Sequence, residues 1–170
     1  MNIPFFNYQS LFKDYEKIFI EIYSDIGRRG AYIMQKDLSN FEANVEKYTG
    51  IKHAIGVGNA TDAMQLLLKA GGIGIGDEVI FCSHTMIATA SAIAFTGATP
   101  IPVEVGVDHL IDPNSIIKAI TPRTKAIMPT QLNGRVADMD KILDIAQKHG
   151  LQVYEDSAQA LGASYKGQCA

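Results

Sequence analysis

Residues 125–155, KAIMPTQLNGRVADMDKILDIAQKHGLQVYE, contain two short apolar runs separated by a helical pattern. The runs are Lys125–Pro129 and Leu151–Glu155. Between them, Asp138–His149 repeats apolar residues on one face of a helix and stops before Gly150, a residue typical of helix C-termini. Two strands joined by a helix in this way lie parallel in one sheet, so the stretch predicts a β-α-β unit.

Three more short runs precede this unit at intervals of roughly 20–30 residues, about the size of a β-α-β repeat. They are His53–Val57, Glu78–Phe81 and Thr99–Val103. Several of the runs are apolar at successive positions, as strands that are buried on both faces tend to be. Asp112-Pro113 is typical of a helix start between two of these strands. We therefore expect an α/β fold, with a mostly parallel sheet and helices on both faces.

Two helical patterns come before the first of these runs. Apolar residues at helical spacing from Leu11 to Ile26 indicate a long amphipathic helix, and Asp37–Thr49 indicates a second one. A chain of 170 residues is long enough for one domain with a sizeable core. We predict a helical arm over residues 1–36 and a single domain over residues 37–170.

Composition and charge exclude several classes of partner. Apolar residues make up 47% of the chain, and the formal net charge is −3. The longest basic cluster is Arg28-Arg29, which argues against nucleic acid or an anionic membrane, since both need clustered positive charge. Met86–Phe95, the most apolar stretch, is too short to cross a bilayer. Met1–Ser10 lacks the pattern of a secretory signal.

The cysteines and histidines do not indicate a metal site. Cys82 and Cys169 lie too far apart in the sequence for a ligand motif or a disulfide framework, so we expect two reduced thiols in a cytoplasmic protein. The four histidines are scattered and form no ligand pair. No Gly-x-Ser-x-Gly motif marks a hydrolase nucleophile.

The segment Gly56-Val57-Gly58-Asn59-Ala60-Thr61-Asp62 joins the first run to a helical pattern over Ala63–Ala70. Small residues let backbone N–H groups approach an anion closely, and a helix N-terminus favours a phosphate. The alternative is a plain turn in which Thr61 or Asp62 caps the helix. Gly72–Asp77 also resembles a nucleotide loop, but it follows a helix and precedes a strand, the reverse of a dinucleotide site. An NAD oxidoreductase is therefore disfavoured.

A second candidate segment, Tyr154–Gln159, lies at the end of the last run. Ligands of open α/β sheets bind beyond the carboxyl ends of the strands, and Asp156 would project there. An acid in this place could keep the ring nitrogen of pyridoxal phosphate (PLP) protonated, so that the ring acts as an electron sink. An Asp at the end of a strand is also a common cap or turn residue. Gln159 could share a face with Asp156 if the chain turns helical there.

Ordered blocks recur from Phe41 to Ala170: Tyr48–Ala54, Gly58–Ala63, Gly74–Ile80, Gly97–Pro100, Ile120–Ile127 and Glu155–Ala160. Taken together, these blocks resemble the DegT/DnrJ family of sugar-nucleotide aminotransferases. The resemblance implies the N-terminal part of the large domain of a type I PLP-dependent transferase. It also implies a homodimer that moves an amino group, usually from glutamate, to a keto-sugar linked to a nucleotide.

The same resemblance implies roles for individual residues. Asp156 would pair with the pyridine nitrogen and Gln159 with the ring hydroxyl. Ala60, Thr61 and Asp62 would hold the phosphate, mainly through backbone amides. Ala60 stands where glycine is common in the family, which is tolerable at negative φ.

Two further positions depart from the family pattern. Met86 stands where members often place an aromatic ring over the cofactor; its thioether can pack on a ring, or His84 could stack there instead. The Schiff-base lysine of the family lies in a later segment, and Lys166 does not replace it because its Tyr-Lys-Gly setting matches an exposed hairpin. We therefore expect residues 37–170 to form an incomplete PLP-binding domain that is inactive by itself.

Three functions remain open on these residues. The first is a sugar aminotransferase represented by an incomplete chain. The second is a PLP-dependent sugar dehydratase, since some relatives replace the lysine with histidine. The third is a non-catalytic binding or assembly protein.

Overall fold

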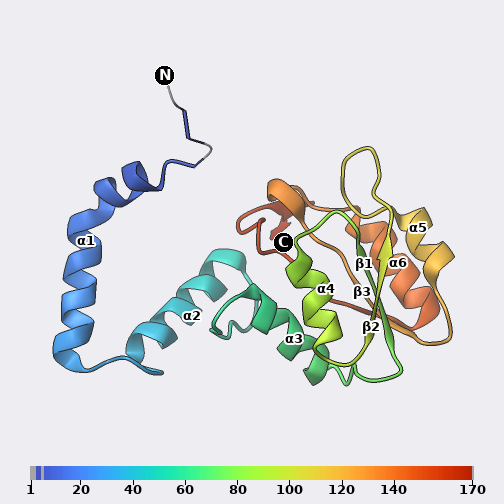
Figure 1. Cartoon of the computed structure of the whole chain (residues 1–170), viewed down its shortest axis with the longest axis horizontal. Coiled ribbons are helices and arrows are strands. Elements are labelled where there is room, and N and C mark those ends of the chain that lie inside the picture. The colour runs from blue at the N-terminus through green and yellow to red at the C-terminus, as the bar shows by residue number, and fades with distance from the viewer. Residues whose placement is uncertain (1–2, 5, 170) are drawn as a thin grey trace. The chain divides into compact units, whose positions relative to one another are not determined.

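The computed structural model describes residues 3–4 and 6–169, and the chain divides into two compact units, residues 1–44 and 45–170 (Figure 1). In the first unit, helix α1 (Tyr8–Arg29) confirms the long predicted helix, and α2 (Lys36–Thr49) begins there. The left-handed Gly30 ends α1, as expected for a residue without a side chain at a helix C-terminus.

The second unit is built on a four-stranded sheet whose paired strands are all parallel. In spatial order its strands are β2 (Thr99–Val103), β1 (Glu78–Cys82), β3 (Thr124–Met128) and β4 (Gln152–Val153). The helices are α3 (Ala60–Ala70), α4 (Ile87–Ala94), α5 (Pro113–Ala119) and α6 (Met139–His149), with a 3₁₀ turn at Leu132–Gly134. A separate antiparallel hairpin joins β5 (Ser164–Tyr165) to β6 (Gln168–Cys169).

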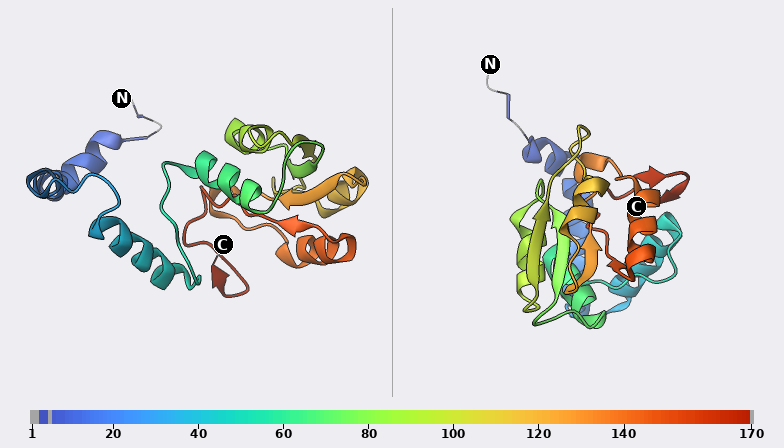
Figure 2. Two further views of the ribbon diagram at one scale, coloured as in Figure 1. Left: turned by 90° about the horizontal axis from the view of Figure 1, so that it is seen from below. Right: turned by 90° about the vertical axis from the view of Figure 1, so that its right-hand side faces the viewer.

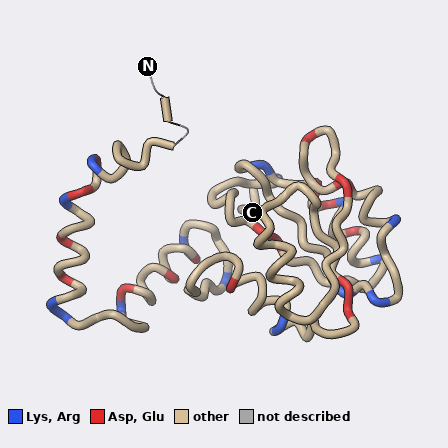
Figure 3. The backbone as a smooth tube through the Cα atoms, viewed as in Figure 1, with Lys and Arg blue, Asp and Glu red and all other residues tan. Residues whose placement is uncertain are grey.

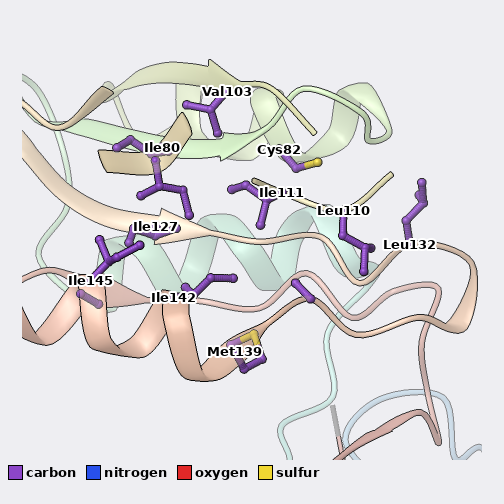
Figure 4. Packing of buried hydrophobic residues seen from close by; sticks show 13 residues of the cluster. Ile80, Cys82, Val103, Leu110, Ile111, Ile127, Leu132, Met139, Ile142 and Ile145 are labelled. Atoms are coloured by element: carbon purple, nitrogen blue, oxygen red, sulfur yellow. The ribbon is translucent and has the colours of Figure 1, made fainter. Parts of the chain in front are cut away.

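Side chains of the central strands are buried on both faces of the sheet. In β1, Ile80 packs in a cluster with residues of α5 and α6, whereas Val79 packs in a second cluster with residues of α3 and α4. Figure 2 shows α4 and α6 on opposite sides of the sheet. In Figure 4, Ile80 and Ile127 point toward Ile142 on α6. The expected α/β fold, with helices on both faces, is confirmed.

The ends of the predicted helices agree closely with the sequence signals. Asp112 caps α5 by accepting a hydrogen bond from the amide of Asn114 at 3.0 Å, and Pro113 is the first helical residue. Asp138 caps α6 in the same way, and Gly150 ends that helix at a φ of 66°. These caps satisfy backbone groups that a helix end leaves without an intrahelical partner.

One predicted strand is wrong. Residues 53–57 belong to no sheet in the described part of the chain, although their composition favours a strand. A strand exists only where a neighbouring backbone pairs with it, and none of β1–β4 pairs with this segment. Ile55 is consequently 82% exposed. An apolar run in the sequence does not indicate whether a neighbouring strand is present to pair with it.

Glu78, at the start of the internal strand β1, is buried. It accepts hydrogen bonds from the hydroxyl of Thr121 and from the guanidinium of Arg123, whose Nε lies 2.9 Å from Oε1. These bonds, first that from Thr121 and then those from Arg123, lower the pKa of Glu78 below its usual range. The ionised group links the start of β1 to the turn before β3.

We expect the stability of the protein to depend on the ionisation of Glu78. Because its pKa is lower in the folded than in the unfolded chain, the stabilisation is present above the ordinary glutamate value of about 4.3 and is lost as pH falls. Glu78→Gln should therefore unfold at a lower temperature than wild type at pH 7, with a difference that shrinks toward pH 3. Thermal unfolding followed by circular dichroism measures this, with Glu104→Gln at an exposed position as the control. A difference that stays constant between pH 7 and pH 3 would contradict the interpretation.

Candidate active site

A cavity of about 360 Å³ lies where β1, β3 and β4 end and where α3 and α4 begin. This volume falls in the range of small-molecule sites. Five of the six residues predicted from the sequence line it together: Ala60, Thr61, Met86, Asp156 and Gln159.

Two backbone N–H groups in the first turn of α3 have no hydrogen-bond acceptor among the described residues. Asn59 caps the helix, since its Oδ1 accepts from the amide of Asp62 at 3.0 Å and its carbonyl accepts from the amide of Ala63. The amides of Ala60 and Thr61 donate to no acceptor in the described part of the chain. Unsatisfied amides and the positive end of a helix dipole suit an anion such as a phosphate.

Asp62, the sixth predicted residue, does not line the cavity. Its Oδ2 accepts from Nδ2 of Asn59 at 2.9 Å, and its amide is engaged by the cap. Two amides, rather than three, are therefore open toward an anion. The N-cap is Asn59, so the alternative in which Thr61 or Asp62 caps the helix is wrong.

Asp156 is held by the sheet and is only 6% exposed. Its amide donates to the carbonyl of Pro129 and its carbonyl accepts from the amide of Gln131, both at 2.9 Å, so that the β3–β4 pairing continues to this residue. In the side chain, Oδ2 accepts from the hydroxyl of Thr89 at 2.7 Å and Oδ1 from the amide of Ala158 at 3.3 Å. No ion pair among the described residues includes Asp156.

Of the remaining predicted side chains, Met86 and Gln159 line the cavity and His84 does not. Met86 precedes α4, is 66% exposed and lines the cavity. His84 does not line it, because its ring packs edge-on against His109 with the ring centroids 5.8 Å apart. Gln159 accepts a hydrogen bond from the amide of Asn133 at 3.3 Å through Oε1, which leaves its Nε2 as a donor.

Sequence reasoning assigned no role to the other residues of the cavity: Asn59, Met64, Thr85, Ala88, Thr130 and Ala158. Asn59 and Ala158 lie within the two candidate segments, whereas the other four lie outside them. A signal was present for two of them. Thr85 follows β1 and Thr130 follows β3, and residues just after parallel strands reach the same edge of the sheet. Met64 and Ala88 lie on helices, where their apolar character gave no indication of a site.

Other candidate groups lie outside the cavity. Lys166 lies at the turn of the β5–β6 hairpin, with a φ of 52°, and forms an ion pair with Asp140. Its side chain is 67% exposed, in agreement with the expected exposed hairpin. Neither Cys82 nor Cys169 forms a disulfide within the described residues, and burial raises the pKa of the Cys82 thiol. No group of three or more metal-binding side chains occurs among residues 3–4 and 6–169.

Basic positions are dispersed along the part of the chain that the structure describes (Figure 3). Figure 3 shows Lys and Arg dispersed along the tube and interleaved with Asp and Glu. No helix among the described residues has the length and apolar character needed to cross a bilayer.

Comparison with known proteins places the chain in a family. Residues 14–170 match the DegT/DnrJ/EryC1/StrS aminotransferase family. A Streptomyces venezuelae protein, dTDP-3-amino-3,4,6-trideoxy-alpha-D-glucose transaminase, is 45% identical over 170 residues, which is 98% of this chain and 44% of the relative. The chain thus spans less than half the length of this relative.

Solved structures agree with the sequence comparison. DesV of S. venezuelae superposes with a TM-score of 0.95 at 42% identity, over 99% of this chain and 46% of DesV. NtdA of Bacillus subtilis, solved with bound cofactor PMP, gives a TM-score of 0.93 at 32% identity, over 99% of this chain and 39% of NtdA. The matched region includes α3, the parallel sheet and the segment that carries Asp156. On these grounds, the chain belongs to the DegT/DnrJ/EryC1/StrS aminotransferase family.

Proposed function

We propose that this chain forms the cofactor-binding part of a PLP-dependent sugar-nucleotide aminotransferase. The observation that carries the proposal is one cavity lined both by the open amides of Ala60 and Thr61 and by the buried carboxylate of Asp156. A phosphorylated pyridine needs both groups: donors for the phosphate and an anion beside a protonated ring nitrogen. The residues present therefore fit PLP.

Each residue would have a distinct task toward this cofactor. The amides of Ala60 and Thr61 would bind the phosphate, and Asp156 would keep the ring nitrogen protonated. The Nε2 of Gln159 would donate to the ring hydroxyl, and Met86 would pack on the ring face. When bound, PLP supplies an electron sink that allows an amino group to be moved between carbon skeletons.

The substrate class follows from the relatives rather than from this cavity. The S. venezuelae relative is named for an amino sugar carried on dTDP, which supports a nucleotide-linked keto-sugar as acceptor here. We propose glutamate as the amino donor and a homodimer as the assembled form. The specific sugar and nucleotide would be bound by residues in addition to those of this cavity.

A proline substitution tests whether the amides of Ala60 and Thr61 bind the phosphate. Ala60→Pro removes one N–H at the first helical position, where proline fits, and the preceding Asn59 already has extended backbone angles. A hydrogen bond to a charged group contributes about 1.5–3 kcal/mol, so affinity for PLP should fall by roughly 10- to 100-fold. Affinity for pyridoxal, which lacks the phosphate, should not change. Fluorescence titration measures both ligands.

Ala60→Gly is the matched control because it keeps the amide and should bind PLP within about threefold of wild type. Equal loss of affinity for PLP and pyridoxal in Ala60→Pro would instead indicate a damaged helix. In that case the phosphate assignment would be wrong.

The second prediction concerns Asp156. Asp156→Asn keeps the size of the side chain but removes the charge, so affinity for PLP should fall by roughly 10- to 100-fold. Asp144→Asn removes an exposed carboxylate of α6 that pairs with Lys148, and it should bind PLP like wild type because such surface pairs contribute little. Undiminished PLP binding by Asp156→Asn would show that another group faces the ring nitrogen.

The third prediction concerns turnover. No residue lining the cavity is a lysine, and Lys166 is held at the hairpin by Asp140. Aminotransfer needs a side-chain base that moves a proton to and from the substrate, a task that a lysine in the cavity could perform, so this chain, supplied with PLP, glutamate and a nucleotide-linked keto-sugar, should form no 2-oxoglutarate above background. A coupled glutamate dehydrogenase assay detects that product. Sustained turnover by the purified chain would mean that one of its own lysines reaches the cavity.

A further inference from the structure

Three threonine hydroxyls form a connected chain that ends on Asp156. Thr130 Oγ1 lies 3.0 Å from Thr85 Oγ1, Thr85 Oγ1 lies 2.9 Å from Thr89 Oγ1, and Thr89 Oγ1 lies 2.7 Å from Asp156 Oδ2. Thr89 is fully buried and Thr130 is 2% exposed, so bulk water does not replace the bond between Thr89 and Asp156; Thr85, which lines the cavity, is half-buried. The residues come from three places, the loop after β1, the helix α4 and the end of β3, and they converge on one carboxylate.

The number of hydrogens on each group indicates which hydroxyl donates and which accepts. A threonine hydroxyl has a single hydrogen to donate, and an ionised carboxylate only accepts. Thr89 must use its hydrogen for Asp156, so its oxygen accepts from Thr85. The oxygen of Thr85 is then free to accept from Thr130. The single hydrogen of Thr130 has two acceptors within reach, and Thr85 Oγ1 at 3.0 Å is closer than Asp156 Oδ2 at 3.5 Å. With this choice, each bond of the hydroxyl chain polarises the next toward the carboxylate.

The same count distinguishes the two oxygens of Asp156. Oδ2 accepts the short bond from Thr89 and lies 3.5 Å from the hydroxyl of Thr130. Oδ1 accepts one longer bond, from the amide of Ala158 at 3.3 Å. The hydroxyl chain therefore occupies one oxygen and leaves acceptor capacity on the other.

We propose that Thr85, Thr89 and Thr130 are positioning residues for Asp156, which hold its Oδ2 through a one-way hydroxyl chain and leave Oδ1 to accept a hydrogen bond from a ligand N–H. In the cofactor site proposed above, on which this step rests, that N–H is the protonated ring nitrogen of PLP. The role proposed for the threonines is exerted through the carboxylate, and Thr89, unlike Thr85 and Thr130, does not line the cavity.

The ligand-binding test separates a hydroxyl effect from a packing effect. Thr89→Val replaces the hydroxyl with a methyl group of similar shape, and Thr89→Ser restores the hydroxyl. The two ligands are PLP and its carbocyclic analogue, in which CH replaces the ring nitrogen. We expect Thr89→Val to bind PLP about tenfold more weakly and Thr89→Ser to bind within about threefold of wild type. Both should bind the analogue like wild type.

Three results of this test would overturn the proposal. Thr89→Val could bind PLP like wild type, Thr89→Ser could be as weak as Thr89→Val, or the analogue could be weakened as much as PLP. Thr85→Val should give a smaller loss, about two- to threefold, because it acts through Thr89. If Thr85→Val lost more affinity for PLP than Thr89→Val, the proposed order of the hydroxyl chain would be wrong.

A cofactor-free test keeps the hydroxyl chain distinct from the proposed function. In protein labelled with ¹³C-threonine in mixed H₂O and D₂O, a slowly exchanging hydroxyl gives two resolved Cβ signals. Thr89 should show this splitting in wild type and in Asp144→Asn, and lose it in Asp156→Ala, which removes its acceptor. An unsplit Thr89 Cβ signal in wild type would refute the hydroxyl chain. If wild type binds no PLP but Thr89 is split as expected, the proposed function fails while the hydroxyl chain stands.

Discussion

Parallel strand pairing is the constraint on which the candidate site depends. Because β1, β3 and β4 run in the same direction, their carboxyl ends lie at one edge of the sheet, and the chain leaves all three strands there. Residues after β1 supply Thr85, residues after β3 supply Thr130, and the segment after β4 supplies Asp156. The ladder between β3 and β4 extends to Asp156 itself, so backbone hydrogen bonds of the sheet, rather than a loop, fix the position of the carboxylate.

The sequence predicted those parts of the fold that local patterns determine. The caps at Asp112 and Asp138 are specified by residues within one turn, and the buried strands by apolar runs. Residues 53–57 show the limit, because a strand also needs a neighbouring backbone, which an apolar run does not encode. The N-cap of α3 was misplaced for a related reason, since Asn59, Thr61 and Asp62 are all good capping residues and only backbone geometry selects among them.

Thr61 and Asp156 were singled out from the sequence because each carries chemistry and a fixed place in a motif, and both line the cavity. The site was not predicted where a residue acts through a neighbour. Thr89 lies in the apolar helix α4, 67 positions from Asp156, and a single threonine among apolar residues indicates only a helix that can be buried. Its importance arises from the packing of α3 and α4 on one face of the sheet, which turns the hydroxyl toward the carboxylate.

The choice of hydroxyls beside Asp156 has a consequence for binding. A buried carboxylate needs compensation, and an arginine or lysine would provide it with a full positive charge. Such a cation would also compete with an incoming N–H⁺ group for the same oxygens, and its field would disfavour a second positive charge nearby. Threonine hydroxyls stabilise the anion without adding charge, and Asp156 is the one charged side chain among the described residues that line the cavity. The neutral threonine chain around Asp156 thus suits a carboxylate whose partner is a cationic ligand rather than another residue of the protein.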